Sequence, residues 1–163
     1  MIFLIKEKIK RRSFFVIFNE KDRCFDIEPF EQNHNNFTSL EIGFLQIGID
    51  FDKRLTYVWG YEPLIKYSET NKFPSAYEDR DLVAVIEREL IPGVSIELDK
   101  EKDWPTYINK DMGWVCIGDP TIEERRLIKF ASDSIATLNN ESEMVAIWLH
   151  PKELPSHILK KKN

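Results

Sequence analysis

Short apolar stretches recur along the chain and predict β-strands. Their β-branched and aromatic residues are typical of strands, and a length of roughly four to eight residues fits the same assignment. The stretch over residues 113–118 is bounded by glycines, which is typical of a central strand. The stretches assigned in this way are residues 13–18, 42–49, 55–59, 94–98, 113–118 and 144–149.

The second and third of these stretches predict a β-hairpin. Asp50 and Asp52 lie between them and favour a turn. Gly43 and Gly48 weaken the first strand and indicate a bulge or a close approach of the backbone. The two aspartates also resemble the start of an oxygen-ligand metal site. No glycine and distal glutamate follow to complete a calcium loop, so a turn is the favoured interpretation.

The segment over 121–139 predicts the one long helix. Thr121 and Glu124 have the spacing of a capping box, and Pro120 suits the first turn. The asparagines that end the segment supply a left-handed stop. Five apolar residues fall on one face at helical spacing. They are Leu127, Ile128, Ala131, Ile135 and Leu138.

Two other segments are less regular. Residues 81–91 fit either a short helix or a strand, with a slight preference for the helix, and Pro92 with Gly93 ends the element. The polar residues 28–39 predict a loop with local disorder.

Together these elements predict an α+β fold. We expect a mostly antiparallel sheet of five to seven strands, with one long and one shorter helix packed on it. A chain of 163 residues fits a single domain, 1–163. Its basic N-terminal segment, residues 1–12, is expected to be loose or to open with a short strand or helix over 2–5. The basic tail, residues 155–163, is expected to be loose or to form a short turn.

Charge is distributed unevenly along the chain. The 23 Lys and Arg against 28 Asp and Glu give a net charge of −5. Eight of the basic residues lie in 1–12 and 160–162, so residues 13–159 carry a net charge of −12. An acidic surface repels nucleic acid and attracts a basic partner, although acidic surfaces also simply keep proteins soluble. We therefore expect no nucleic-acid partner.

The sequence predicts no cofactor and no metal site. Cys24 and Cys116 are far apart in the chain, which gives neither a disulfide framework nor metal-ligand spacing. His150 and His157 are separated by two prolines and match no zinc motif. The chain has no apolar stretch of about 20 residues that would span a bilayer, and no secretory signal is visible, so we expect a cytoplasmic protein without a membrane partner.

No catalytic constellation is evident, and we expect a protein that is not an enzyme. No nucleophile elbow occurs, and neither cysteine has a catalytic context. Paired carboxylates could in principle carry out acid–base chemistry, but acidic runs are usually solvated edges.

An acidic segment next to aromatic residues is the best candidate for a binding surface. Trp104 and Tyr107 lie in a polar stretch, and Trp and Tyr are enriched at interface hot spots. Packing of these aromatics back onto the core is equally compatible with the sequence. The predicted partner-binding residues are Glu87, Glu89, Glu97, Asp99, Glu101, Asp103, Trp104 and Tyr107.

Four stretches of the chain, together with its size and acidity, resemble the small immunity proteins of bacterial polymorphic toxin and contact-dependent growth inhibition systems. The resemblance is one of general style and offers no residue motif. The stretches are residues 50–61, 90–96, 113–119 and 146–151.

The resemblance implies a cytoplasmic, non-catalytic protein that binds and neutralises a cognate toxin C-terminal domain, a basic protein and often a nuclease. Two other function classes remain open. One is an intracellular regulatory or scaffold module that binds a peptide or forms a homodimer. The other is a hydrolase that depends on carboxylates alone. The sequence leaves the oligomeric state open.

Overall fold

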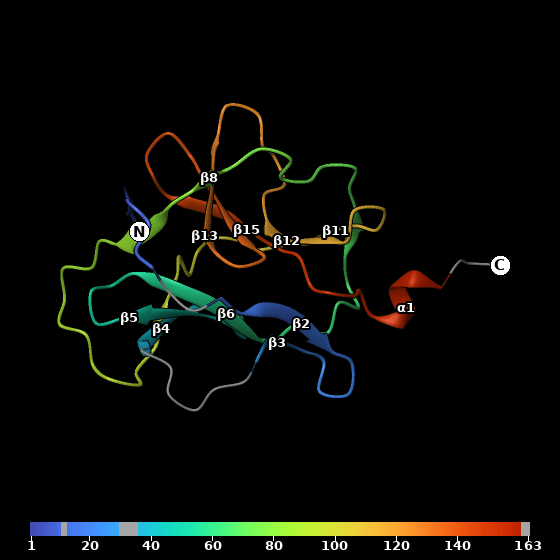
Figure 1. The fold of residues 1–163 in the computed structure, drawn as a ribbon, viewed down its shortest axis with the longest axis horizontal. Coiled ribbons are helices and arrows are strands. Elements are labelled where there is room, and N and C mark those ends of the chain that lie inside the picture. Colours follow the sequence, from blue (N-terminus) through green and yellow to red (C-terminus); the bar gives the residue numbers. More distant parts are fainter. Residues whose placement is uncertain (11–12, 30–35, 161–163) are drawn as a thin grey trace.

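A computed structural model describes residues 1–10, 13–29 and 36–160, which fold into two facing β-sheets (Figure 1). The lower sheet in Figure 1 has six strands, antiparallel except for one parallel pair at its edge. In spatial order they are β10 (Ile96–Glu97), β4 (Asn36–Ile42), β5 (Leu45–Asp50), β6 (Leu55–Tyr61), β3 (Cys24–Glu28) and β2 (Phe15–Asn19).

The upper sheet has seven strands. Its two edges are two-residue strands that pair in parallel, and its centre is antiparallel. In spatial order the strands are β7 (Ser68–Glu69), β11 (Thr106–Asn109), β12 (Trp114–Gly118), β15 (Met144–Leu149), β14 (Ser134–Leu138), β13 (Arg126–Ala131) and β8 (Glu78–Asp79).

A third, small sheet joins two distant parts of the chain. β1 (Phe3–Lys6) pairs antiparallel with β9 (Asp81–Ala84). Phe3 and Leu82 are buried in the main core, so this ribbon closes one side of the sandwich. In this way Phe3–Lys6, within the basic N-terminal segment, is part of the fold.

The main core fills the space between the two large sheets. Phe25, Leu40 and Ile47 from the six-stranded sheet, with Val115 and Ile147 from the seven-stranded sheet, are fully buried in one cluster. A second cluster lies on the opposite face of the seven-stranded sheet, so that sheet is buried on both faces. The second cluster contains Cys116, Leu127, Ile135, Ala146 and Trp148, with Tyr107, Trp114 and Ile122 packed against it.

The described residues are all-β, which corrects the predicted α+β class: they form 15 strands in three sheets and one helix of four residues. The predicted helix over 121–139 is the hairpin of β13 and β14. Because this hairpin is apolar on both faces, period-two alternation is lost and the remaining spacing mimics a helix. Asp119 Oδ1 accepts a hydrogen bond from the Thr121 amide at 3.0 Å, so the expected capping group holds a turn instead.

Of the two alternatives for residues 81–91, the preferred helix is wrong, and the strand is confirmed for residues 81–84. These four residues form β9, and the following residues 85–95 are neither helix nor strand. Asp81, Leu82 and Ala84 are buried, whereas Val85 is exposed, so the apolar residues do not form the continuous face that a helix needs.

The predicted hairpin is confirmed, with one refinement. β5 and β6 pair antiparallel, and Asp50 accepts the turn amides of Asp52 and Arg54 at 3.0 and 2.9 Å. Gly43, with φ +59°, lies in a further turn that ends β4, so Ile42 belongs to the preceding strand. β4 also shows that the predicted loop over 28–39 ends by residue 36; residues 30–35 lie outside the described part.

The C-terminal residues cross from the seven-stranded sheet to the edge of the six-stranded sheet (Figure 1). The Lys152 amide donates to Val16 O at 3.0 Å, and the Val16 amide donates to Asp133 Oδ2 at 3.2 Å. Leu154, and Ile158 of helix α1 (Ser156–Leu159), are buried in the main core. We call residues 150–158 the C-terminal strap, since they tie β2 to the opposite sheet. No helix in the described ranges is long and apolar enough to cross a membrane.

Candidate functional site

The predicted acidic residues lie on two loops and one edge strand. Glu87 and Glu89 are exposed in the segment between β9 and β10, and Glu97 lies on β10. Two acids of the predicted patch have basic neighbours within the same segment. Lys100 lies 3.4 Å from Glu97, and Lys102 lies 3.4 Å from Asp99. Glu101 and Asp103 are exposed in the turn that leads to β11.

The two predicted aromatic residues lie apart from most of these acids: Tyr107 is on β11 of the seven-stranded sheet, and Trp104 is in the segment just before β11. Trp104 packs against the main core, with the Lys102 ammonium 5.9 Å from its ring centroid. Tyr107 packs against the second cluster, and Cys116 is its neighbour on β12. The structure therefore does not bring Tyr107 together with Glu97, because the two residues lie on sheets whose outer faces point apart. The binding role of the eight residues stays a prediction.

A row of side chains that the sequence analysis missed crosses the outer face of the six-stranded sheet. The strand register places four residues side by side on the neighbouring strands β10, β4, β5 and β6. Glu97 lies opposite Glu41, Glu41 opposite Gln46, and Gln46 opposite Trp59. The preceding or following residue on each strand is buried in the core, so these four point outward. Glu97 is exposed and the other three are partly exposed. We call this set the acid–aromatic row.

A hydrogen-bond network fixes the middle of the row. Gln46 Nε2 donates to Glu41 Oε1 at 3.0 Å. Gln46 Oε1 accepts from the Ser39 and Ser95 hydroxyls at 2.5 and 3.1 Å, and those hydroxyls lie 2.7 Å apart. The amide therefore has one orientation, with its nitrogen toward the carboxylate and its oxygen toward the serines.

Gly48 leaves the space for a second polar contact beside the row. Its ideal Cβ would lie 2.3 Å from Thr56 Oγ1 and 2.4 Å from Asn36 Nδ2. The Thr56 hydroxyl donates to Asn36 Oδ1 at 2.5 Å across this position. Of the two alternatives predicted at Gly48, the bulge is confirmed by the register shift between Ile47 and Ile49. The atoms that meet over Gly48 are side-chain atoms of β4 and β6, not backbone.

Aromatic rings pack beside Trp59. The Tyr57 ring centroid lies 5.2 Å from that of Trp59 and 5.5 Å from that of Phe14. Tyr57 is only 8% exposed, and burial raises its pKa to about 12. Further along, Phe44 and Tyr61 meet edge to face, and Phe44 is 76% exposed. The row thus ends in a group of aromatic side chains.

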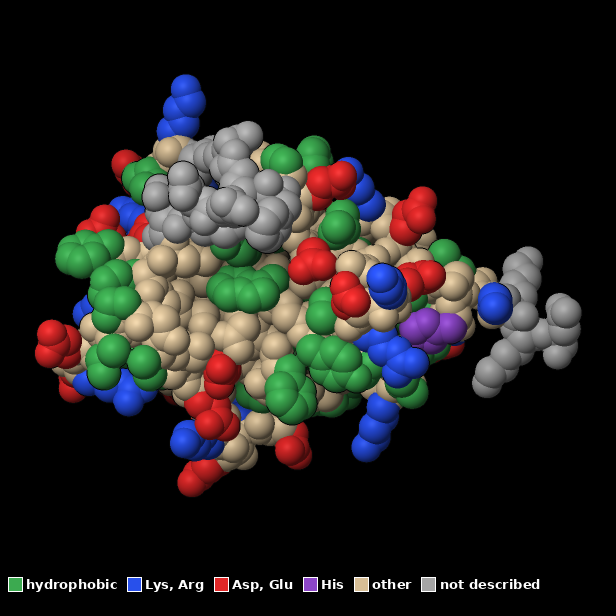
Figure 2. Space-filling view, turned by 90° about the horizontal axis from the view of Figure 1, so that it is seen from below, with side chains coloured by type: hydrophobic (Ala, Val, Ile, Leu, Met, Phe, Trp, Pro, Cys, Tyr) green, Lys and Arg blue, Asp and Glu red, His purple; other side chains and the backbone are tan. Residues whose placement is uncertain are grey.

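Figure 2 shows the molecule from this side. Backbone and uncharged side chains form much of the left and central part, with acidic and basic side chains around it. A centre with few charges and a charged margin is the usual arrangement of a protein-binding surface. This face is therefore the candidate functional site.

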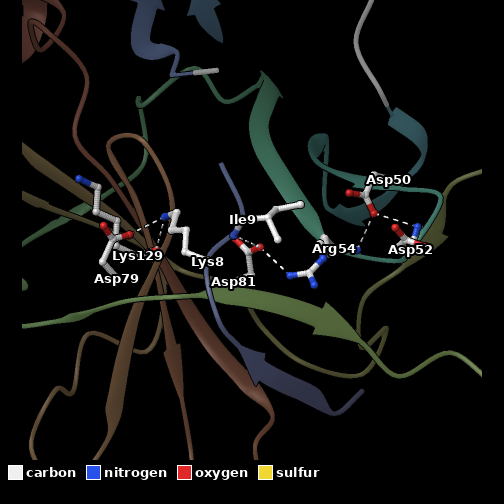
Figure 3. Close-up of polar contacts among 8 residues, drawn as sticks. All are labelled: Lys8, Ile9, Asp50, Asp52, Arg54, Asp79, Asp81 and Lys129. Carbon is white, nitrogen blue, oxygen red and sulfur yellow. Dashed lines mark hydrogen bonds and ion pairs between the residues drawn. The ribbon is translucent and has the colours of Figure 1, made fainter. Parts of the chain in front are cut away.

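The polar cluster in Figure 3 has a structural role instead. The Arg54 guanidinium lies 2.6 Å from the fully buried Asp81 carboxylate, which also accepts from the Ile9 amide at 3.2 Å. Lys8 pairs with Asp79 and donates to Lys129 O at 3.0 Å. These contacts tie residues 8 and 9 to the strands, and Asp50 and Asp52 form the predicted turn.

The histidines and cysteines considered for catalysis or metal binding have surroundings in the structure that do not favour these roles. His150 and His157 each lie 3.0 Å from a backbone carbonyl oxygen, and His34 is outside the described residues. Burial raises the pKa of both Cys24 and Cys116, which is the reverse of nucleophile activation. In the part of the chain that the structure describes, no three His, Cys, Asp or Glu residues are grouped to hold a metal.

A shallow pocket of about 530 Å³ lies at the β7–β11 edge, lined in part by Glu69, Asn109 and Asp111. Its acids are not a buried pair: Glu69 is 67% exposed and is paired with Lys110, and Asp111 is exposed. The pocket therefore lacks the buried carboxylates that would favour the hydrolase alternative.

In comparisons with known proteins, no protein-family model and no curated protein sequence matches this chain.

Proposed function

We propose that this chain is an immunity protein that binds and neutralises a basic toxin domain through the outer face of its six-stranded sheet. The observation that carries the proposal is the acid–aromatic row. It combines two carboxylates with a partly exposed indole on one rigid sheet face.

Charge supports a basic partner. Residues 13–159 carry a net charge of −12, and Glu41 and Glu97 are neighbours on paired strands. A nuclease domain is basic because it grips phosphates, so the two surfaces attract each other over a distance and associate quickly.

The aromatic residues supply short-range affinity. Trp59 is partly exposed and is supported by the buried Tyr57, so its ring is held in place before the partner arrives. Rigid aromatic anchors of this kind dominate binding energy, and polar neighbours around them exclude water.

Binding would neutralise the toxin by occupation. The inhibitor's carboxylates take the positions that substrate phosphates occupy on a basic cleft, or they cover a surface that the toxin needs to reach its substrate. Neither route requires chemistry by this chain. The protein would act in the cytoplasm of the cell that makes it.

Co-expression tests the proposal. The toxin domain to use is the variable C-terminal domain of a large secreted protein encoded beside this chain's gene. We expect the chain to restore growth and to co-purify with the domain, and a variant carrying Trp59→Ala, Glu41→Lys and Glu97→Lys to fail at both. Glu141→Lys, on an exposed turn of the other sheet, is the matched control. Failure of the unaltered chain to bind and to rescue would overturn the proposal.

A scaffold module is the second candidate, favoured by the exposed Phe44 and Phe51 at 76% and 78%. It predicts self-association that Phe44→Ser weakens. Light scattering over a concentration series distinguishes it from a monomeric inhibitor.

A further inference from the structure

We infer that the acid–aromatic row binds an arginine side chain of the partner, with the guanidinium between Trp59 and the carboxylate of Glu41. The inference rests on the proposed function, because it names the group of the basic partner that meets this face. It also makes a claim that a short peptide can test without any toxin.

The spacing of the row fits one long cationic side chain. Glu41 and Trp59 are separated by a single strand, so their Cα atoms lie about 10 Å apart at the usual strand spacing. Both side chains project from the same face, and Gln46 lies between them. A guanidinium above Gln46 can contact the indole on one side and the carboxylate on the other.

Glu41 is prepared for this contact. Gln46 Nε2 holds Glu41 Oε1 at 3.0 Å, and the two serine hydroxyls hold the amide from the other end. No donor among the described residues reaches Glu41 Oε2. The carboxylate is therefore fixed by one oxygen, while its other oxygen remains an acceptor for a ligand.

Glu97 supplies a second negative charge next to Glu41. Its neighbour Lys100 is 3.4 Å away, and both side chains of this pair are largely exposed, at 48% and 75%. An exposed pair of this kind exchanges readily with solvent or with a competing cation. Glu97 can thus turn to the partner, and two adjacent carboxylates exclude a phosphate group.

Arginine fits the row better than lysine. A guanidinium is planar, stacks on an indole, and presents several N–H donors to a carboxylate at once. A lysine ammonium is a compact, strongly hydrated charge that cannot make both contacts as well. Tyr57 supports the Trp59 ring with centroids 5.2 Å apart, so the stacking partner is rigid.

Peptide binding tests the inference. The probes are three capped pentapeptides of glycine with two arginines, two lysines or two citrullines, titrated at millimolar concentration and followed by NMR of the backbone and indole N–H groups. We expect the arginine peptide to bind at least about tenfold more tightly than the lysine peptide. We expect no binding of citrulline, which has the shape of arginine without its charge. The shifts should centre on the Trp59 indole and on Gln46.

Two variants locate the binding. The double variant Glu41→Gln with Glu97→Gln keeps the side-chain shape, and the variant Trp59→Phe keeps a ring. Each should weaken binding of the arginine peptide at least about tenfold. Glu141→Gln and Trp114→Phe, on the other sheet, should leave it unchanged. Equal binding of arginine and lysine, no binding of arginine, or unchanged binding by the row variants would overturn the inference. If the chain rescues cells but binds the arginine and lysine peptides equally, this inference fails while the proposed function stands. If the chain binds the arginine peptide but does not rescue cells, the proposed function fails while the arginine-binding site stands.

Discussion

Two ion pairs in Figure 3 contain similar groups in different surroundings. Asp81 is fully buried against Arg54, which is itself only 20% exposed, whereas Asp79 is 62% exposed beside Lys8. Breaking a buried pair leaves a desolvated charge, whereas an exposed pair is screened by water. Burial, and not the pairing itself, therefore decides how much each contributes.

Asp81→Asn should accordingly lower the free energy of unfolding by about 3 kcal/mol, because Arg54 keeps its charge without an opposite one. Asp79→Asn is the control and should cost less than about 1 kcal/mol. Urea unfolding followed by tryptophan fluorescence measures both. Equal losses in the two variants would mean that the buried pair is not a stabilising contact.

Tyr57 makes a prediction at high pH. Burial raises its pKa to about 12, above the ordinary 10.0 of the phenol, so the unfolded chain loses this proton first. The stability that the neutral phenol contributes is complete below pH 10 and is lost as the pH rises through about 12. Absorbance of phenolate against pH should show one late step, and Tyr57→Phe should remove that step. Removal of an early step instead would contradict the buried environment.

At the scale of elements, a glycine lets one strand end approach its neighbour. Gly118 has φ +116°, and an added Cβ would lie 2.4 Å from Val145 O and 2.8 Å from Ala146 Cα. These are backbone atoms of β15 and cannot move aside without breaking the central pairing of the seven-stranded sheet. Both the backbone conformation and the contact therefore require glycine.

Gly118→Ala should lower the free energy of unfolding by about 2 to 4 kcal/mol, from strain and overpacking together. Gly93→Ala is the matched control, because φ is +73° there and nothing lies within 4 Å of the added carbon; it should cost about 1 kcal/mol. Guanidinium unfolding gives both values. If the two variants are equally stable, the close approach at Gly118 is not a constraint.

The elements also mark where sequence reasoning succeeds and fails. The strands 113–118 and 144–149 were predictable because their apolar runs are short and, in the first case, bounded by glycines. The hairpin over 121–139 was not, because Ile135 and Ala136 are buried on opposite faces of the sheet and leave no alternation to detect. Its turn at Asp133, with φ +56°, left no glycine or proline as a signal.

The candidate site was only partly accessible from sequence for a related reason. Glu97 was found through the acidic segment around it. Glu41, Gln46 and Trp59 were missed because cross-strand register makes them neighbours, and register depends on the turn at Gly43 and on the bulge after Ile47. The acid count could suggest a basic partner, but not which face meets it.

For the whole molecule, the long-range electrostatic field matters more than any one contact for the rate of association. Reversing Glu97, Asp99, Glu101 and Asp103 to Lys should slow association with the basic toxin domain about tenfold or more and reduce its salt dependence, because steering acts before contact. The matched control reverses Asp111, Glu123, Glu124 and Glu141, which are exposed on loops of the seven-stranded sheet and change the net charge equally. Stopped-flow mixing at low and high salt measures both. An equal effect of the two quadruple variants would show that total charge, and not this edge, governs encounter.

The C-terminal strap has a consequence for the order of folding. β2 is synthesised early. The Lys152 amide that donates a hydrogen bond to its edge is synthesised more than 130 residues later. Contacts of such sequence separation form slowly, because a long segment must first be closed into a loop. A nascent chain therefore carries an uncovered sheet edge and an unfilled place for Leu154 and Ile158 until those residues have been synthesised. We expect the exposed edge and the unfilled apolar site to favour aggregation during that interval, which is the process that chaperones counter.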